Sequence, residues 1–309
     1  MEIDVKKVKF VCRNIITGEE IPDTEPKKKC FFKSKDQEDS EVSKEDLNSN
    51  EEIKEETLEE ETISEQTSKE PIVVEEPKRK IICISKIGSD HIFGNKNNHD
   101  YAFNLLNMKV VMDGCGSGKH SEVGTKLFAQ LFARKAKEYF DKNECINEEN
   151  FIDVVNSVFE KMLAVSNDIS FIFQNYCFTI LVCFEFEDEF VVYTCGDGYI
   201  IKETKDGISF EVLDDGEYPK YYVYNYIKDK SLLKEYKDGV EFKVTHFSKD
   251  DFINVGVATD GLRYSSNLLE VEKNKLMRFL HEGKSAQIEK LINRNNRNEM
   301  FHDDISICF

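Results

Sequence analysis

The sequence lacks the features of membrane-spanning, secreted and nucleic-acid-binding proteins. No apolar run reaches the ~18 residues that cross a bilayer, and residues 1–10 carry charges throughout, without the apolar stretch of a signal peptide. The nine cysteines are scattered singly, with no C-x-x-C pair, and no extended basic segment is present. We therefore expect a monomeric cytoplasmic protein with free thiols that binds neither membranes nor nucleic acid.

Negative charge is concentrated in one part of the chain. The 309 residues carry a formal net charge of -18, and residues 36–70, with fifteen acids and three lysines, supply two thirds of it. Residues 34–78 contain no aromatic residue, so they cannot bury enough apolar surface to offset the entropy of ordering. We predict a short hairpin or docking peptide over 1–33, a disordered acidic linker over 34–78, and one globular domain over 79–309.

In the globular region, strands and helices are segregated along the chain. Apolar residues at three- and four-residue steps predict a helix that starts near Ser121, its expected N-cap, and a second helix over about 148–167. Residues 214–238 have no clear period and are expected to form an insertion or flap. Further helices are expected over about 267–281 and 285–295. Strands are predicted over 81–87, 100–107, 108–112, 176–186, 189–195, 199–203, 209–213, 252–259 and 305–309. This order favours an α+β layered sandwich over alternating βαβ units.

Three aspartates stand at the ends of apolar runs. Asp113 and Asp260 each follow such a run and precede a glycine, and Asp303 lies just before the last run, 305–309. Carboxylates at strand ends gather negative charge at one edge of a sheet, and their oxygens suit hard ions such as Mg²⁺ or Mn²⁺. Glycine after Asp113 also allows a tight bend that exposes carbonyl oxygens as further ligands. The pattern predicts a divalent-metal site and therefore an enzyme.

Five short motifs follow one another along the globular region. They are Asn98-His99-Asp100, Asp113-Gly114-Cys115-Gly116, Cys195-Gly196-Asp197-Gly198, Ala258-Thr259-Asp260-Gly261 and Asp303-Asp304-Ile305-Ser306. In this order and at this spacing they resemble the motifs of the protein phosphatase 2C family of metal-dependent protein phosphatases, in its bacterial-type branch. The corresponding family motifs are Asn-Glu-Asp, Asp-Gly-x-Gly, Gly-Asp-Ser, Ala-Thr-Asp-Gly and a closing Asp-[Asp/Asn]-hydrophobic-[Thr/Ser].

The resemblance implies a four-layer αββα sandwich of two central antiparallel β-sheets flanked by helices, with residues 79–309 as the catalytic domain. It also implies two Mn²⁺ or Mg²⁺ ions per active site. Asp113 would bridge both ions, and Asp260 and Asp303 would hold one of them. The full set of implied ligands is Asp113, Gly114, Asp260, Asp303, Asp100 and His99. A water between the ions would attack the phosphorus of a phosphoserine or phosphothreonine without a covalent intermediate. The implied partners are a phosphorylated protein substrate and a cognate Ser/Thr kinase.

Two departures from the family pattern leave a second function open. His99 replaces the family's glutamate, either as a ligand or as a neighbour of the ligands, and a neutral imidazole suits Mn²⁺ or Zn²⁺ better than Mg²⁺. The family's phosphate-binding arginine falls on Asn95, so the cation is expected from Lys96, Lys119 or His120, which lack the guanidinium fork. A catalytically weak or inactive relative, acting as a binding or regulatory module, is therefore the alternative.

Overall fold

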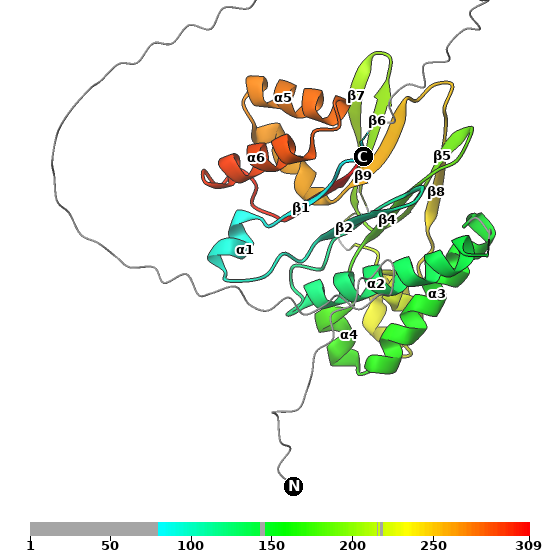
Figure 1. Ribbon diagram of the computed structural model, residues 1–309. Coiled ribbons are helices and arrows are strands. Elements are labelled where there is room, and N and C mark those ends of the chain that lie inside the picture. The colour runs from blue at the N-terminus through cyan, green and yellow to red at the C-terminus, as the bar shows by residue number, and fades with distance from the viewer. Residues whose placement is uncertain (1–79, 143–145, 215, 217–218) are drawn as a thin grey trace, which may run out of the picture. The chain divides into compact units, whose positions relative to one another are not determined.

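Two five-stranded antiparallel sheets form the centre of the fold (Figure 1). The computed structural model describes residues 80–142, 146–214, 216 and 219–309, so the predictions for 1–33 and 34–78 lie outside the described residues. The strand order in the first sheet is β1 (Cys83–Lys86), β10 (Ile305–Cys308), β9 (Asn254–Ala258), β6 (Gly198–Thr204) and β7 (Gly207–Leu213). The order in the second is β2 (Tyr101–Leu105), β3 (Met108–Met112), β4 (Ile180–Glu185), β5 (Glu189–Cys195) and β8 (Lys243–Ser248).

Helices cover the outer face of each sheet, which gives four layers (Figure 1). The second sheet is covered by α2 (Ser121–Phe140), α3 (Glu148–Val165) and α4 (Ile169–Asn175), and the first by α5 (Glu270–His281) and α6 (Ser285–Asn296). Successive residues of a strand face opposite sides of its sheet. Val110 accordingly packs under the helices, whereas Val111 lies in the apolar layer between the sheets. The predicted αββα sandwich is confirmed.

The main differences from the sequence prediction concern short or exposed elements. A short helix, α1 (Ser89–Phe93), was not predicted, and neither were α4 or β8. Strand β8 lies at a sheet edge and is largely exposed, so it lacks the apolar pattern of a buried strand. The predicted N-cap is wrong: His120 is the N-cap of α2, and Ser121 Oγ donates to the Cys115 carbonyl at 2.6 Å.

Three connections between the described helices and strands contain 3₁₀ turns. The predicted flap region contains two of them, η2 (Tyr222–Tyr226) and η3 (Lys230–Tyr236), and a third, η4 (Asp260–Asn267), follows β9. Tyr222 is buried and packs in the same apolar cluster as α3, so at least this part of the region is a packed covering segment. Within the described residues, no helix is both long and apolar enough to cross a membrane.

The aromatic cluster beneath α2 and α3 supplies a test of the packing. Phe128 is fully buried, and its ring contacts those of Phe132, Phe159 and Phe178. Phe128→Ala should lower the free energy of unfolding by about 3–5 kcal/mol in chemical denaturation. Phe93→Ala is the matched control, because that ring is 71% exposed and its loss should cost less than about 0.5 kcal/mol. Equal effects of the two substitutions would contradict this packing.

Candidate functional site

Strand ends from both sheets bring aspartates together. Asp100 precedes β2 and Asp113 follows β3, its neighbour in the second sheet, whereas Asp303 precedes β10 of the first sheet. We call Asp100, Asp113 and Asp303 the acid cluster. Loss of hydration and then the negative charges of Asp100 and Asp303 raise the pKa of Asp113 well above its usual range. The carboxylates are therefore close enough to repel one another.

Asp100 is buried and held by hydroxyl groups. Thr259 Oγ1 donates to Asp100 Oδ2 at 2.6 Å, and the Ser306 N–H in turn donates to Thr259 Oγ1 at 2.8 Å. Burial is the first cause that raises the Asp100 pKa, and the charge of Asp304 is the second. Because Thr259 and Ser306 belong to the first sheet, this network fixes a carboxylate of the second sheet against the first.

The backbone around Asp113 is fixed by the start of the β4 segment. The Asp113 N–H donates to Thr179 Oγ1 at 3.1 Å, and the Asp113 carbonyl accepts from the Thr179 N–H at 2.8 Å. Gly114, the predicted carbonyl ligand, follows in a bridge to Phe178. A Cβ on Gly114 would lie 2.7 Å from the His99 carbonyl oxygen. Glycine is required here because another part of the backbone passes close by.

Asp260 begins η4 and is paired with an arginine that the sequence prediction missed. The Arg263 guanidinium forms an ion pair with Asp260 Oδ2, and Arg263 Nε donates to the Asp260 carbonyl at 3.1 Å. Asp260 Oδ1 is buried, and no donor reaches it from the described residues. The i, i+3 spacing of the two residues was the one signal in the sequence, because side chains at this spacing meet in a helical turn.

Asp304 is a hydrogen-bond centre next to the acid cluster. Its carboxylate accepts from the backbone N–H of Gly88 at 2.7 Å and of His99 at 2.6 Å, and it lies 2.8 Å from His91 Nδ1. The sequence pointed to Asp303 in this motif and assigned no role to Asp304. The hydrogen bonds show that Asp304 ties the start of β10 to the segment that leads into β2.

The ring of His99, a predicted ligand, lies beside His91 and Glu122. Its ring lies 4.3 Å from that of His91, and His99 Nε2 is 3.6 Å from Glu122 Oε2. Within the described part of the chain, neither His99 Nδ1 nor Glu122 Oε2 has a hydrogen-bond partner. Glu122 Oε1 accepts from Asn97 Nδ2 at 2.9 Å. The structure therefore groups His99 with Glu122 and His91, a set that no pattern in the sequence indicated.

The pKa values of the two neighbouring histidines are shifted in opposite directions. The hydrogen bond to Asp304 raises the His91 pKa above its ordinary value of 6.5. Burial, and then the charge on His91, lower the His99 pKa. Although His99 lies within ion-pair distance of Glu122, the separation is long and the ring is buried, so near neutral pH we describe it as a neutral imidazole beside a carboxylate.

The three predicted phosphate contacts lie in or beside the loop between β3 and α2. Lys96 Nζ donates to the Gly116 carbonyl at 3.1 Å, which places this lysine at the glycine-rich loop after Asp113. His120 Nδ1 lies 3.6 Å from Glu122 Oε1, and Lys119 is exposed in the same loop before α2. Asn95 has a positive φ of 52°, a conformation that asparagine adopts more readily than arginine.

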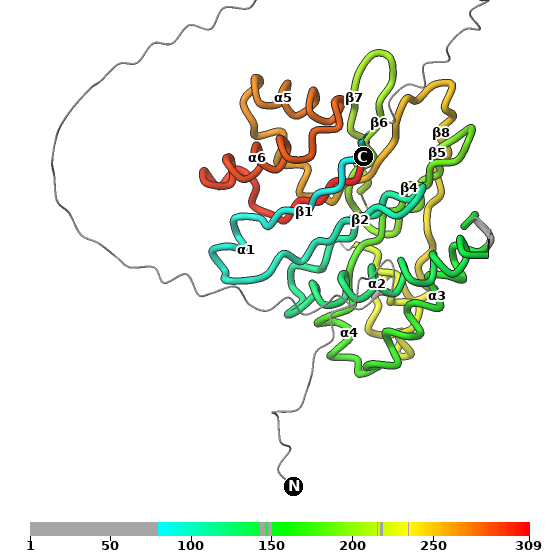
Figure 2. The backbone as a smooth tube through the Cα atoms, in the orientation of Figure 1, coloured from blue at the N-terminus to red at the C-terminus, as the bar shows by residue number. Residues whose placement is uncertain are grey.

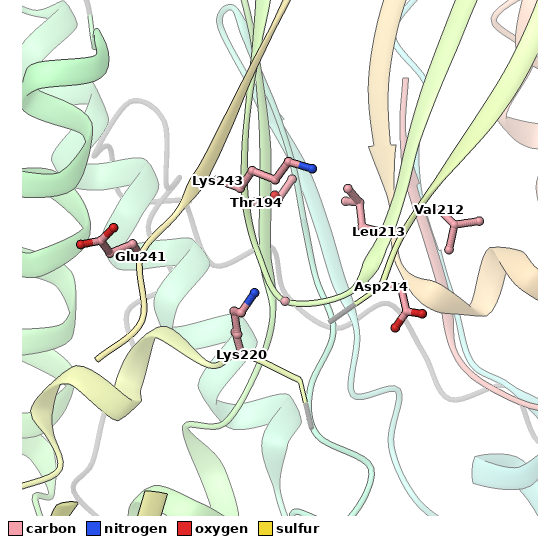
Figure 3. A pocket seen from close by; sticks show the side chains of 8 residues that line it. Thr194, Val212, Leu213, Asp214, Lys220, Glu241 and Lys243 are labelled. Carbon is pink, nitrogen blue, oxygen red and sulfur yellow. The ribbon is translucent and has the colours of Figure 1, made fainter. Parts of the chain in front are cut away.

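A cavity of about 260 Å³ lies beside the turn that follows β5 (Figure 3). The amines of Lys220 and Lys243 point into the space between β5 and β7. Its lining comprises Thr194, Gly196, Val212, Leu213, Asp214, Lys220, Glu241 and Lys243. Gly196 is also packed against Thr179, the residue that holds Asp113, and Asp197 in the same turn adds to the charge that raises the Asp113 pKa. The cavity thus adjoins the support of the acid cluster.

The donor chemistry of the site fits a divalent cation. Asp113, Asp260 and Asp303 offer carboxylate oxygens, the acid cluster carries uncompensated negative charge, and Asp260 Oδ1 has no donor among the described residues. In the described ranges, no three His, Cys, Asp or Glu side chains are already arranged to hold a metal ion. Binding an ion there requires these side chains to adjust, and Arg263 already competes for Asp260.

The sequence and the fold were each compared with those of known proteins. The sequence profile of the protein phosphatase 2C family matches residues 87–299. No curated protein matches the chain. The fold is similar to that of a bacterial serine phosphatase carrying a point mutation, with 15% identity, a TM-score of 0.52 and coverage of 75% of this chain and 98% of that chain. A second variant of a bacterial serine phosphatase has 14% identity, a TM-score of 0.51 and coverage of 74% and 96%. The catalytic domain of the serine threonine protein phosphatase PstP, in complex with two manganese ions, has 14% identity, a TM-score of 0.49 and coverage of 74% and 96%.

The raised pKa of His91 predicts a pH-dependent stability. Because the folded-state pKa exceeds the unfolded value of 6.5, protonated His91 stabilises the fold below about pH 6.5, and this contribution is lost as pH rises through the folded-state pKa. His91→Gln should therefore lower the thermal midpoint more at pH 6 than at pH 9. The exposed His246 provides the control substitution His246→Gln. An equal loss for His91→Gln at both pH values would contradict the assignment.

Proposed function

Because the chain belongs to the protein phosphatase 2C family, we propose that it hydrolyses phosphoserine and phosphothreonine monoesters of proteins with the help of divalent metal ions. The family is one of protein-serine/threonine phosphatases, which are hydrolases that act on phosphoproteins. The observation that carries the proposal is the acid cluster, in which Asp100, Asp113 and Asp303 converge from the strand ends of both sheets. A set of carboxylates that have lost hydration and repel one another is costly unless it binds a cation.

We assign the predicted ligands as follows. Asp113, the Gly114 carbonyl, Asp260 and Asp303 hold two Mn²⁺ or Mg²⁺ ions, which when bound supply Lewis acidity and an activated water. Asp100 stays fixed by the Thr259 hydroxyl and keeps the local charge negative. We assign His99 to the support of this site through its N–H bond to Asp304, although its imidazole remains available as a nitrogen donor.

The phosphate contact requires cations other than the family's arginine. Lys96 is held at the Gly116 carbonyl, next to the loop after Asp113, and is the first candidate of the three predicted residues, Lys96, Lys119 and His120. Arg263 is a stronger one, because release from Asp260 would free a planar guanidinium that binds two phosphate oxygens at once. In this proposal Asp260 would help to hold an ion, and the Arg263 guanidinium would bind the phosphate of the substrate.

The remaining assignments concern context. We propose that residues 79–309 form the catalytic domain and that it acts as a monomer on a phosphorylated protein, opposite a cognate Ser/Thr kinase. We place it in the cytoplasm, where its free cysteines would stay reduced. The alternative, a weakly active or inactive binding module, is favoured by one observation: the Arg263 guanidinium neutralises Asp260, one of the predicted ligands.

Carboxylate substitutions test the catalytic proposal. Asp113→Asn and Asp260→Asn should each reduce Mn²⁺-dependent hydrolysis of p-nitrophenyl phosphate by at least about 100-fold, because a neutral amide is a poor ligand for a hard cation. The control is Asp206→Asn, in the exposed turn between β6 and β7, and it should leave the rate unchanged. Full activity in both site variants would rule out this mechanism.

Arg263 provides a separate test that does not rely on activity alone. Removing a cation that competes for Asp260 should tighten Mn²⁺ binding by about 5- to 10-fold in calorimetry of Arg263→Ala. The same variant, saturated with Mn²⁺, should show a several-fold higher KM for p-nitrophenyl phosphate if Arg263 contacts the phosphate. Arg278→Ala, on α5 with its guanidinium against Phe279, is the control. Absence of Mn²⁺ binding in every form would favour the binding module.

A further inference from the structure

Two cysteines lie opposite each other on neighbouring strands from the two ends of the described domain. Strand β1 runs antiparallel to β10, and Cys83 is the register partner of Cys308. Figure 2 shows the two strands side by side, β1 in cyan and β10 in red. Residues 82 and 309 exchange both backbone hydrogen bonds, each at 2.8 Å. Because the two kinds of pair alternate along an antiparallel ladder, the next pair, Cys83 with Cys308, is a non-hydrogen-bonded pair.

This type of pair suits a disulfide. Cα atoms of a non-hydrogen-bonded pair lie about 4.5 Å apart, and their side chains are closer than in the other type. Disulfides form over Cα separations of about 4.4–6.8 Å. The Cys83 thiol is close enough to Cys308 to be, after burial, a further cause of the raised pKa of the Cys308 thiol. The bond can therefore form with rotation of the side chains and without movement of the strands.

The surroundings differ for the two sulfur atoms. Cys308 is fully buried in the layer between the sheets, where its Sγ lies 3.5 Å from the Phe103 carbonyl oxygen. Cys83 packs against the same layer but is only partly buried, and β1 is an edge strand of its sheet. We therefore expect a small reagent to reach Cys83 from the solvent. Cys308, on the neighbouring strand, is out of contact with water.

We propose that Cys83 and Cys308 are an oxidative modification site, at which a peroxide joins β1 to β10 through a disulfide. The Cys83 sulfur takes one oxygen from hydrogen peroxide, the O–O bond breaks, and a sulfenic acid and one water result. The Cys308 sulfur then attacks the Cys83 sulfur, the S–O bond breaks, and the disulfide and a second water form. The two thiols lose two electrons, and the peroxide gains them.

The crosslink would act on the strand pair that leads to the acid cluster. Asp303 and Asp304 immediately precede β10, and Gly88, whose N–H is held by Asp304, follows shortly after β1. A disulfide between the first and last strands closes a loop that includes almost all of the described domain, so it restricts the unfolded chain strongly. The inference is independent of the proposed phosphatase activity, because it uses only the ladder and its two thiols.

Peptide mapping of the full-length protein tests the site directly. After treatment with hydrogen peroxide and alkylation of the remaining thiols, tryptic cleavage releases residues 81–86 and 298–309, each with a single cysteine. We expect these two peptides to be joined, at a mass two hydrogens below their sum, and to separate after reduction by dithiothreitol. Oxidation should also raise the thermal midpoint by about 5 °C or more.

Variants separate this site from general oxidation. Cys83→Ser and Cys308→Ser should each remove the joined peptide and the rise in thermal midpoint, whereas Cys183→Ser, which changes another buried cysteine of the same layer, should retain the joined peptide. The wild-type map does not depend on how the variants fold. Recovery of peptide 81–86 as the free thiol or the sulfonic acid, or its joining to a peptide other than 298–309, would overturn the proposal.

Discussion

The structure around the acid cluster depends on the hydrogen bonds of the Asp304 carboxylate. It accepts hydrogen bonds from two backbone N–H groups, of Gly88 and His99, and binds the His91 ring. Gly88 precedes α1, His91 lies within it and His99 follows it, so one buried carboxylate fixes the connection between β1 in the first sheet and β2 in the second. Together with the Thr259 hydroxyl, which holds Asp100, it ties the start of β2 in the second sheet to the start of β10 in the first. Charged acceptors make the stronger hydrogen bonds, which suits a carboxylate to this position.

The three carboxylates of the acid cluster lie near Asp304 and repel one another. Asp100, Asp113 and Asp303 each have a raised pKa, and loss of hydration is the leading cause in every case. Arg263 forms an ion pair with Asp260, and its charge together with that of His91 offsets part of the rise in the Asp303 pKa. Such an arrangement costs stability and is tolerated where charge is used, which is why perturbed carboxylates mark functional sites. The sequence departs from the family pattern at His99 and Asn95, where an imidazole and an amide stand in place of a glutamate and an arginine.

Local patterns in the sequence predicted the fold and the positions of the main carboxylates. Asp113 and Asp260 were identifiable because each ends a buried strand and precedes a glycine, and both glycines prove to lie against other backbone, Gly114 at His99 and Gly261 at Asp304. The direction of the His99 ring could not be predicted, because it depends on His91 and Glu122, which come from separate helices. The same holds for Asp304, whose role arises from two distant backbone N–H groups. Strand β8 escaped detection because an exposed edge strand has no apolar period.

The pairing of β1 with β10 also determines how the domain would respond to tension. Residues 82 and 309 meet at the same end of an antiparallel ladder. A pull applied through the segment before residue 82 and through residue 309 would load one backbone pair at a time, so the strands would unzip from that end. A parallel or sheared arrangement would instead share the load among all of its hydrogen bonds. The next pair to separate after residues 82 and 309 is Cys83 with Cys308. A disulfide between these two residues would therefore stop the strands from separating further.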